Sequence, residues 1–262
     1  MNLTAAMPNV IETKNVSLVY KTESREVTAL QDIHLEIKEG SFVCVLGPSG
    51  CGKTSLLRIL AGFQQPTSGE VLLDGKAMSP KPDKSRGVVF QQHTLFPWLT
   101  VEKNVEFGLK MRKVPERERK QTVDRYLEMV GLSQFKKTAP YELSGGMKQR
   151  ASIARVLAND PRIVLMDEPF GALDAFTKEQ MQENVRQIWI KTNKTFFLIT
   201  HDVDEALLLG THIIVMSPRP GRIIREFDSR LTYEIQEGQS RAYRMNKQIL
   251  EKREEILNLI TH

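Results

Sequence analysis

The residues with the clearest chemistry form the run Gly47–Thr54, which reads GPSGCGKT and fits the pattern G-x-x-x-x-G-K-[ST]. Its glycines allow the backbone to curl, so that several N–H groups point inward at phosphate oxygens. Lys53 is expected to reach the β- and γ-phosphates of a nucleotide, and the Thr54 hydroxyl suits a Mg²⁺ ion. The predicted nucleotide-binding positions are Gly47, Pro48, Ser49, Gly50, Cys51, Gly52, Lys53, Thr54 and Ser55.

The elements on either side of this loop support the same interpretation. Ser41–Leu46 reads as a buried strand because its central residues are apolar in succession. Ser55–Gly62 reads as a helix, whose first turn presents unpaired N–H groups and the positive end of its dipole to an anion. A glycine-rich turn that arose by chance would not need this order of strand, loop and helix.

Two adjacent carboxylates, Asp167 and Glu168, follow the apolar strand Ile163–Met166. Ligands bind at the carboxyl ends of strands in open parallel sheets. Asp167 is placed to hold Mg²⁺ through water, and Glu168 to orient or deprotonate an attacking water. Such a pair is often only the end of a strand, but together with the phosphate loop it predicts a nucleoside triphosphatase. Kinases, GTPases, helicases and motors all remain open at this point.

The run Leu143–Arg150 reads LSGGMKQR and is a second pattern suited to an anion. Its glycines allow a tight turn, Ser144 offers a hydroxyl, and a helix begins there with free N–H groups. One chain does not need two such nests for one nucleotide, so we expect this one to contact the nucleotide of another copy. The run resembles the signature motif of the ATP-binding-cassette (ABC) ATPases. Its Ser144 lies 91 residues after Lys53 and 24 residues before Glu168, which is where that family places this motif.

The resemblance extends from about residue 10 to 225 and implies roles for further residues. Tyr20 stands where the family stacks an aromatic ring on adenine, although an isolated Tyr near a strand end is usually a packing residue. Gln91 matches the glutamine that reaches Mg²⁺ and the attacking water. His201 matches the switch histidine at the γ-phosphate, and Asp174 belongs to a loop at the subunit interface. The resemblance thus implies ATP and Mg²⁺ as cofactors. It implies catalytic roles for Glu168, His201 and Gln91, and it implies Thr54, Gln91 and Asp167 as metal ligands. It also implies contacts to the opposite subunit's ATP from Ser144, Gly145, Gly146 and Gln149.

Two segments indicate a branch of this family. Residues 96–101 (FPWLTV) and 217–223 (SPRPGRI) resemble the ATPases of bacterial nitrate, sulfonate, taurine and bicarbonate importers. The resemblance implies a homodimer under two transmembrane permease subunits, with an extracytoplasmic solute-binding protein that delivers the solute. It implies a peripheral protein on the cytoplasmic face of the inner membrane, without a nucleic-acid partner. The solute itself stays open.

An alternative function is a soluble ABC ATPase that acts on nucleic acid or the ribosome, but such proteins usually carry two cassettes or a long coiled-coil insertion.

Within the importer interpretation, the place of Phe96, Pro97, Trp98 and Leu99 is open. These residues either form an exposed apolar patch that receives a permease or fill the core of their own subdomain.

Alternating strands and helices predict an α/β fold with a largely parallel sheet and a helical insertion. The resemblance completes this fold as a P-loop NTPase core with a mixed, mostly parallel sheet, an antiparallel β subdomain and an inserted helical subdomain. The core is expected at about 10–94 and 155–230, and the helical subdomain with the signature at about 95–154. A charged C-terminal helix is expected at about 240–262. Its apolar face would carry Ile249, Leu250, Ile256, Leu257 and Ile260. Expected strands are Val10–Tyr20, Ala29–Ile37, Gly69–Leu73, Thr195–Thr200 and Ile213–Ser217, and expected helices Lys178–Thr192 and Val203–Gly210.

Composition narrows the setting. The 262 residues carry a formal net charge of +5, 40% are hydrophobic, and two are cysteines, which disfavours a disulfide framework. Since no apolar run approaches the roughly 20 residues of a membrane span and the N-terminus lacks a signal-peptide pattern, we expect a reducing cytoplasm. Cys51 is interpreted as a loop residue and not as a redox or metal centre. Its place at a helix N-terminus beside Lys53 suggests the further hypothesis of a reactive thiol that nucleotide would protect.

Overall fold

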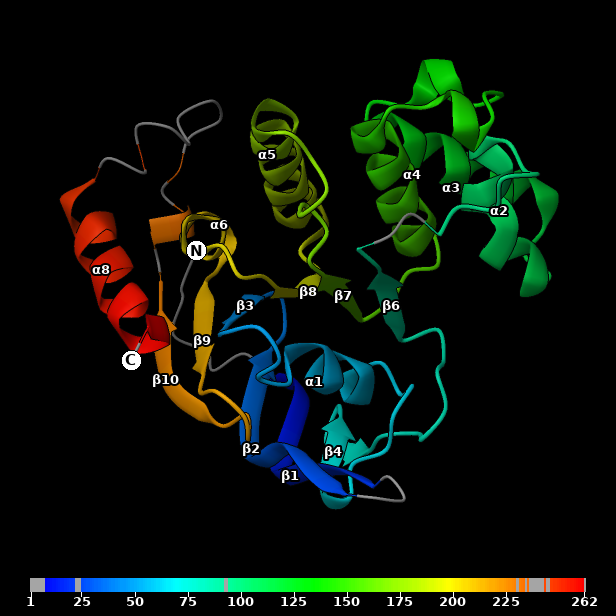
Figure 1. The fold of residues 1–262 in the computed structure, drawn as a ribbon. Helices are drawn as coiled ribbons and strands as arrows, with labels where there is room; N and C mark the ends of the chain where they lie inside the picture. Colours follow the sequence, from blue (N-terminus) through cyan, green and yellow to red (C-terminus); the bar gives the residue numbers. More distant parts are fainter. Residues whose placement is uncertain are drawn as a thin grey trace. The chain divides into compact units, whose positions relative to one another are not determined.

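The computed structural model describes residues 8–21, 25–91, 94–229, 231–233, 235, 243 and 246–261. The chain divides into two compact units. One comprises Met1–Asp83 and Asn193–His262, and the other comprises Lys84–Thr192. Figure 1 shows the helices and strands of both units.

The first unit contains an antiparallel sheet in the order β2-β1-β4-β5. Alternation along the strands explains its two faces: Ile33, Leu35 and Ile37 are buried, whereas the charged and polar residues between them are exposed. The strands expected at 10–20, 29–37 and 69–73 are confirmed, and one short strand is additional. The strands are β1 (Asn9–Lys21), β2 (Glu26–Lys38), β4 (Ser68–Leu73) and β5 (Lys76–Ala77).

A second sheet of the same unit is mainly parallel. Its strands are β10 (Ile223–Asp228), β9 (His212–Met216), β3 (Phe42–Leu46) and β8 (Thr195–Ile199), in that order. β3 is parallel to β8 and β9, and β10 is antiparallel to β9. Every residue of β3 and β8 is buried, as continuous apolar sequence predicts. β10 was not predicted, because its sequence IIREFD shows neither a continuous apolar run nor a regular alternation of buried and exposed residues.

The helices of this unit include α1 (Lys53–Leu60), α6 (Val203–Leu209) and α8 (Lys247–Thr261), together with a short 3-10 turn at Leu231–Tyr233. α1 packs against β2 and β8, and α6 packs against β3. α8 contacts α6 and β9 and closes this side of the unit (Figure 1). Its Ile249 and Ile256 are buried, but Leu250 is exposed, so the predicted apolar face is narrower than expected. The predicted helical residues 240–242 and 244–245 lie outside the described residues.

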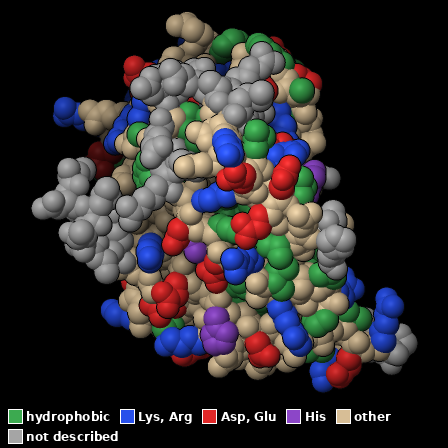
Figure 2. All heavy atoms as spheres, turned by 90° about the vertical axis from the view of Figure 1, so that its left-hand side faces the viewer, with side chains coloured by type: hydrophobic (Ala, Val, Ile, Leu, Met, Phe, Trp, Pro, Cys, Tyr) green, Lys and Arg blue, Asp and Glu red, His purple; other side chains and the backbone are tan. Residues whose placement is uncertain are grey.

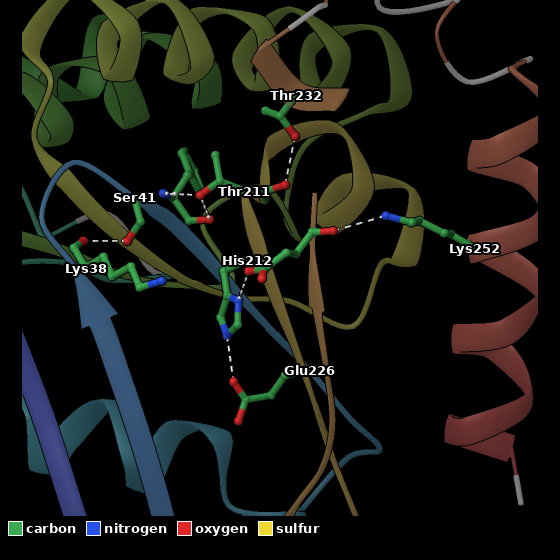
Figure 3. Close-up of polar contacts among 10 residues, drawn as sticks. Lys38, Ser41, Thr211, His212, Glu226, Thr232 and Lys252 are labelled. Carbon is green, nitrogen blue, oxygen red and sulfur yellow. Dashed lines mark hydrogen bonds and ion pairs between the residues drawn. The ribbon is translucent and has the colours of Figure 1, made fainter. Parts of the chain in front are cut away.

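Polar contacts tie the edge of the second sheet to its neighbours (Figure 3). The imidazole of His212 on β9 lies between two carboxylates of β10, 2.7 Å from Glu226 Oε2 and 2.8 Å from Asp228 Oδ1. Lys252 on α8 donates from Nζ to the carbonyl oxygen of Asp228 at 3.1 Å. Thr232 donates to the carbonyl oxygen of Gly210 at 2.7 Å. These bonds hold β9, β10 and α8 together.

The second unit combines a pair of parallel strands with helices. β6 (Arg86–Val89) pairs with β7 (Ile163–Asp167), and α2, α3 and α4 pack against one another. These helices form the block expected at about 95–154. The unit is wider than that block, because α4 also packs on β6 and α5. Its helices are α2 (Val101–Met111), α3 (Glu116–Met129), α4 (Gly145–Leu157) and α5 (Ala175–Thr192), with short 3-10 turns at Ser133–Phe135 and Pro140–Glu142.

The surface carries both signs of charge. On the face in Figure 2, Lys and Arg side chains are interspersed with Asp and Glu. Among the described residues, the helices are too short or too polar for any of them to cross a bilayer.

Candidate nucleotide site

The predicted phosphate loop lies between β3 and α1, as expected. Gly50 and Gly52 adopt left-handed backbone angles, with φ of 75° and 105°. A side chain at Gly52 would also collide, because its Cβ would lie 2.7 Å from Leu30 Cδ2 and 2.8 Å from the carbonyl oxygen of Ala29. No side chain caps the start of α1. A helix start without a side-chain cap suits the binding of an anion.

Lys53 crosses the loop with its charged end inside. The residue is 7% exposed, and Nζ donates to the carbonyl oxygens of Gly47 at 2.7 Å and Pro48 at 3.1 Å. These carbonyls satisfy a buried ammonium that would otherwise be costly. The loop thus holds a positive charge within itself, which suits the binding of nucleotide phosphates.

The two cysteines are both buried, which contradicts the expected reactivity of Cys51. Cys51 is 1% exposed, and its Sγ lies 4.0 Å from Lys53 Nζ beneath the loop. A Cβ at Gly47 would approach this sulfur to 2.9 Å, so the thiol fills the space under the loop. Burial raises the pKa of the Cys44 thiol well above its ordinary value, and the charge of Glu205 adds to this effect. Neither thiol is placed to react.

We therefore expect an aromatic disulfide reagent to modify neither Cys44 nor Cys51 in the native chain. Both should react once the chain is denatured, because only exposure and thiolate formation limit the reaction. The released thiolate absorbance counts the modified cysteines. Fast stoichiometric labelling of native protein, abolished in Cys51→Ser, would restore the hypothesis of a reactive loop cysteine.

Tyr20 lies beside the phosphate loop. It is near the end of β1, and its hydroxyl is 3.2 Å from Ser55 Oγ on α1. The ring is 38% exposed. An exposed ring at the start of α1 fits the predicted stacking on a base better than the packing alternative does.

His201 lies two residues after the end of β8 and is exposed. Thr200 donates its N–H to the carbonyl oxygen of Val45 at 3.1 Å, which places the end of β8 beside the end of β3. Asp202 donates its N–H to Thr200 Oγ1 and caps α6 by accepting from the Glu205 N–H at 3.1 Å. His201 is therefore held at the same sheet edge as the phosphate loop.

In the second unit, Gln91 and Glu168 converge on one point. A Cβ on Gly171 would lie 3.5 Å from Gln91 Nε2 and 3.8 Å from Glu168 Oε2. β6 and β7 are parallel with Val89 opposite Met166, so both residues follow strands that end at the same edge. Glu168 has a left-handed φ of 43°. Such strain in a residue other than glycine is frequent at functional sites.

The signature run forms a helix start, as predicted. Ser144 is exposed and caps α4, since its Oγ accepts from the Met147 N–H at 3.3 Å. Gly146 lets α4 approach α5 closely, because a Cβ there would lie 2.8 Å from Thr177 Cγ2. A groove of about 470 Å³ lies between the two helices, lined by Ser144, Gly146, Met147, Arg150, Thr177, Gln180, Met181, Glu183 and Asn184. The exposed helix start remains suited to an anion.

Gln149 does not fit its predicted role. It lies inside α4 and is 0% exposed, so it is not displayed to a nucleotide outside the chain. The sequence placed it beside Ser144 and the glycines, but helical geometry turns position 149 away from the exposed helix start. The prediction of a contact to the opposite ATP is wrong for this residue.

Asp174 caps α5. Its Oδ1 accepts from the Thr177 N–H at 3.0 Å, and this backbone hydrogen bond is the main reason why the pKa of the carboxyl is lowered. Leu173 lies against the signature, since its Cδ2 is 3.6 Å from the Cβ position of Gly145. The predicted interface loop and the signature are thus neighbours. The cap alone is a sufficient structural reason for an Asp at 174.

The segment 217–223 also reaches the phosphate loop, which the sequence did not predict. Its residues served only as a mark of the importer branch, yet Arg219 in this segment donates to the carbonyl oxygen of Gly50 at 3.3 and 3.2 Å. The two residues are 169 positions apart. No local pattern signals this contact.

The chain is similar to several known proteins. Residues 30–171 match the ABC transporter family. The chain is 51% identical over 247 residues to the taurine import ATP-binding protein TauB of Roseobacter denitrificans, covering 94% of this chain and 92% of the relative. It is 45% identical to the nitrate import ATP-binding protein NrtD of a Synechocystis strain, covering 91% and 89%. A solved dimeric post-hydrolysis structure of the ATP-binding cassette MJ0796 with ADP and Pi matches with TM-score 0.72 and 36% identity, covering 83% and 98%.

Proposed function

The chain belongs to the ABC transporter family, and from this premise we propose that it drives the uptake of a small solute bearing an oxyanion group. It is an ATPase, the ATP-binding subunit of an importer. Nitrate, a sulfonate, taurine and bicarbonate are the candidate solutes. The observation that carries this proposal is the identity of 51% over 94% of the chain to a taurine import subunit.

For hydrolysis, the chain supplies a base and its positioning groups. Glu168 takes a proton from the attacking water, and Gln91, which converges with it on Gly171, orients that water. His201 stabilises the γ-phosphate, and Lys53 with the loop N–H groups binds the phosphate charge. Support comes from the strained backbone of Glu168 and from the placement of His201 at the loop edge.

The side chains proposed for Mg²⁺ have suitable chemistry. Thr54 offers a hydroxyl, Gln91 an amide oxygen and Asp167 a carboxylate, and Mg²⁺ prefers such oxygen ligands. Thr54 and Gln91 are exposed, and Asp167 is half-buried. When bound, the ion would neutralise phosphate charge that develops during hydrolysis.

Two copies are proposed to share each nucleotide. The phosphate loop of one copy would bind ATP, and Ser144, Gly145 and Gly146 of the other would contact its γ-phosphate. The exposed start of α4 and the adjacent loop around Asp174 support this arrangement. The related cassette with ADP and Pi is also dimeric.

An exposed apolar patch is proposed to receive a permease. We define it as Phe96, Trp98, Phe107 and Met111. Trp98 is 76% exposed and Met111 60%, while the Phe96 ring lies 4.6 Å from Phe107 and 5.5 Å from Trp98. Each of the two interpretations of residues 96–99 therefore fits one residue: Trp98 is exposed, as a docking patch requires, and Phe96 is partly buried against its own subdomain. A patch of this kind needs a partner.

Asn104 gives this patch a fixed shape. It is fully buried, and its Nδ2 donates to the carbonyl oxygens of Phe96, Leu99 and Thr100, each at 3.1 Å. Its Oδ1 accepts from the Phe96 N–H at 2.8 Å. A preformed loop loses less conformational entropy on binding than a mobile one.

The test is to tag the chain in its native cell, solubilise the membranes in mild detergent and identify what copurifies. We expect a polytopic permease, and its associated binding protein would indicate the solute. The protein would thereby be placed at the cytoplasmic face of the inner membrane. Recovery only with ribosomes or DNA would leave the ATPase assignment intact and contradict transport.

Trp98→Ala should reduce permease recovery at least about fivefold, because exposed aromatic residues often dominate such interfaces. The control is Tyr233→Ala, which removes another aromatic side chain, 60% exposed, from the other unit. Equal recovery with both variants would contradict the proposed docking patch.

A further inference from the structure

The segment Ser217–Arg222 is a closed turn with its own hydrogen bonds. The Ser217 N–H donates to the Arg222 carbonyl oxygen at 2.9 Å, and the Arg222 N–H returns a bond to Ser217 Oγ at 3.0 Å. The Ser217 hydroxyl is also within 3.0 Å of the carbonyl oxygens of Pro218 and Pro220. The turn therefore has a defined shape.

Strand β2 holds this turn in place. Gly221 donates its N–H to the Ala29 carbonyl oxygen at 3.0 Å and accepts from the Gln31 N–H at 2.9 Å. The Arg222 guanidinium donates to Gln31 Oε1 at 2.6 and 3.2 Å. The turn thus has a rigid support on the sheet.

From this support, the turn contacts the outer side of the phosphate loop at two successive residues. Arg219 donates from Nε and Nη2 to the Gly50 carbonyl oxygen, at 3.3 and 3.2 Å. Gly221 lies close to Cys51, the residue after Gly50, because a Cβ on Gly221 would be 2.0 Å from the Cys51 carbonyl oxygen. Both contacts are to loop carbonyls.

Peptide geometry links these outer contacts to the inner side of the loop. The Gly50 carbonyl and the Cys51 N–H belong to one planar trans peptide and point in opposite directions. Holding the carbonyl outward therefore directs the Cys51 N–H inward, where it donates to the Pro48 carbonyl oxygen over a long 3.4 Å. A guanidinium on the carbonyl also polarises the peptide and strengthens its N–H as a donor.

We propose that Ser217–Arg222 is a clamp that sets the phosphate loop for nucleotide phosphates, with Arg219 as its positioning residue. The residue acts through the loop backbone and does not contact the reacting atoms. The clamp lowers the cost of ordering the loop when ATP or ADP binds. It gives a physical role to a segment that otherwise only marks a branch of the family.

The first test compares Arg219→Ala with Arg225→Ala in the full chain. The control substitution removes the same charge from the neighbouring strand β10, where Arg225 pairs with Glu255 at 3.7 Å and lies over the ring of Phe227. For Arg219→Ala we expect Kd for a fluorescent ATP analogue and for ADP to rise roughly tenfold, the effect of a lost charged hydrogen bond. Arg225→Ala should bind as the parent does.

A split between KM and kcat separates positioning from catalysis and from general damage. Arg219→Ala should raise KM for ATP and leave kcat within about twofold, because the groups proposed for proton transfer are unchanged. Arg219→Lys should recover part of the affinity, since it retains a donor. Unchanged affinity in Arg219→Ala, or a fall in kcat at unchanged KM, would overturn the clamp.

Salt distinguishes the contact from simple attraction by a nearby charge. Screening weakens long-range attraction between about 50 and 500 mM salt, but not a direct hydrogen bond of this kind to the same extent. The affinity ratio of parent to Arg219→Ala should therefore persist at high salt. A ratio that falls to one would overturn the clamp in favour of long-range attraction.

Gly221→Ala tests the second contact without changing charge. The added methyl would meet the Cys51 carbonyl oxygen, so the turn must move away from the loop. We expect nucleotide affinity to fall at least as much as in Arg219→Ala, in protein whose circular dichroism and nucleotide-free Tm show it folded. Parent-like affinity in this folded variant would contradict the clamp.

Discussion

Replacing Glu168 with Gln is expected to lower ATP turnover by about 10²- to 10⁴-fold, the usual contribution of a general base. The amide keeps the size of the side chain but cannot accept the proton of the attacking water. The side chains of Glu168 and Gln91 both lie near Gly171, and the backbone of Glu168 has a left-handed φ of 43°. Phosphate release from ATP is the measurement.

Nucleotide binding should survive this change. The phosphate loop belongs to the other compact unit, and Gln retains the polar contacts of Glu apart from its charge. We therefore expect ATP to accumulate unhydrolysed and to trap a dimer, which size-exclusion chromatography with and without ATP detects. The control is Glu128→Gln, an exposed carboxylate on α3. Normal turnover in Glu168→Gln would show that another group is the base.

Replacing Lys53 with Met should weaken ATP and ADP binding by about 10- to 100-fold, the value of one or two charged hydrogen bonds to phosphate. Lys53 is 7% exposed and spans the loop to the carbonyls of Gly47 and Pro48. Met occupies a similar volume but provides no donor. Titration calorimetry of the purified chain with ADP measures the effect directly.

Lys53→Met should also lower the thermal stability of the nucleotide-free protein. Without the ammonium, the carbonyls of Gly47 and Pro48 lose a donor inside the loop, so we expect a small fall in nucleotide-free Tm. Lys14→Met is the control, since Lys14 is half exposed and pairs with Glu70 over 3.6 Å at the surface. Parent-like affinity in Lys53→Met would contradict the proposed phosphate contact.

Local patterns were sufficient where short-range rules decide the structure. Glycine spacing, a buried strand before it and a helix after it predicted the loop at 47–55, because backbone angles and helix starts depend on neighbouring residues. Alternation predicted β1 and β2, and a Ser followed by two glycines predicted the start of α4. The resemblance then assigned chemistry to Glu168 and His201.

Other properties depend on which distant segments meet, and the sequence did not contain them. Cys51 looked reactive beside Lys53 until packing placed its thiol under the loop. Gln149 looked like part of the signature, but the turn of α4 buries it. The strands β6 and β10 each form against a strand that is distant in sequence or weakly signalled by local pattern: β6 pairs with β7, and β10 pairs with β9.

By itself, therefore, the sequence determined the class of this protein: a nucleotide-phosphate loop, its carboxylates and an importer-type cassette. The phosphate loop follows from residue types at short spacing, where sterics and hydrogen bonding are local, and the importer-type cassette follows from the resemblance of its motifs to a known family. Only the tertiary structure decided that Arg219 lies on the Gly50 carbonyl, 169 positions away. The free energy of such a contact comes from the packing of both segments on β2, and no local pattern encodes that packing.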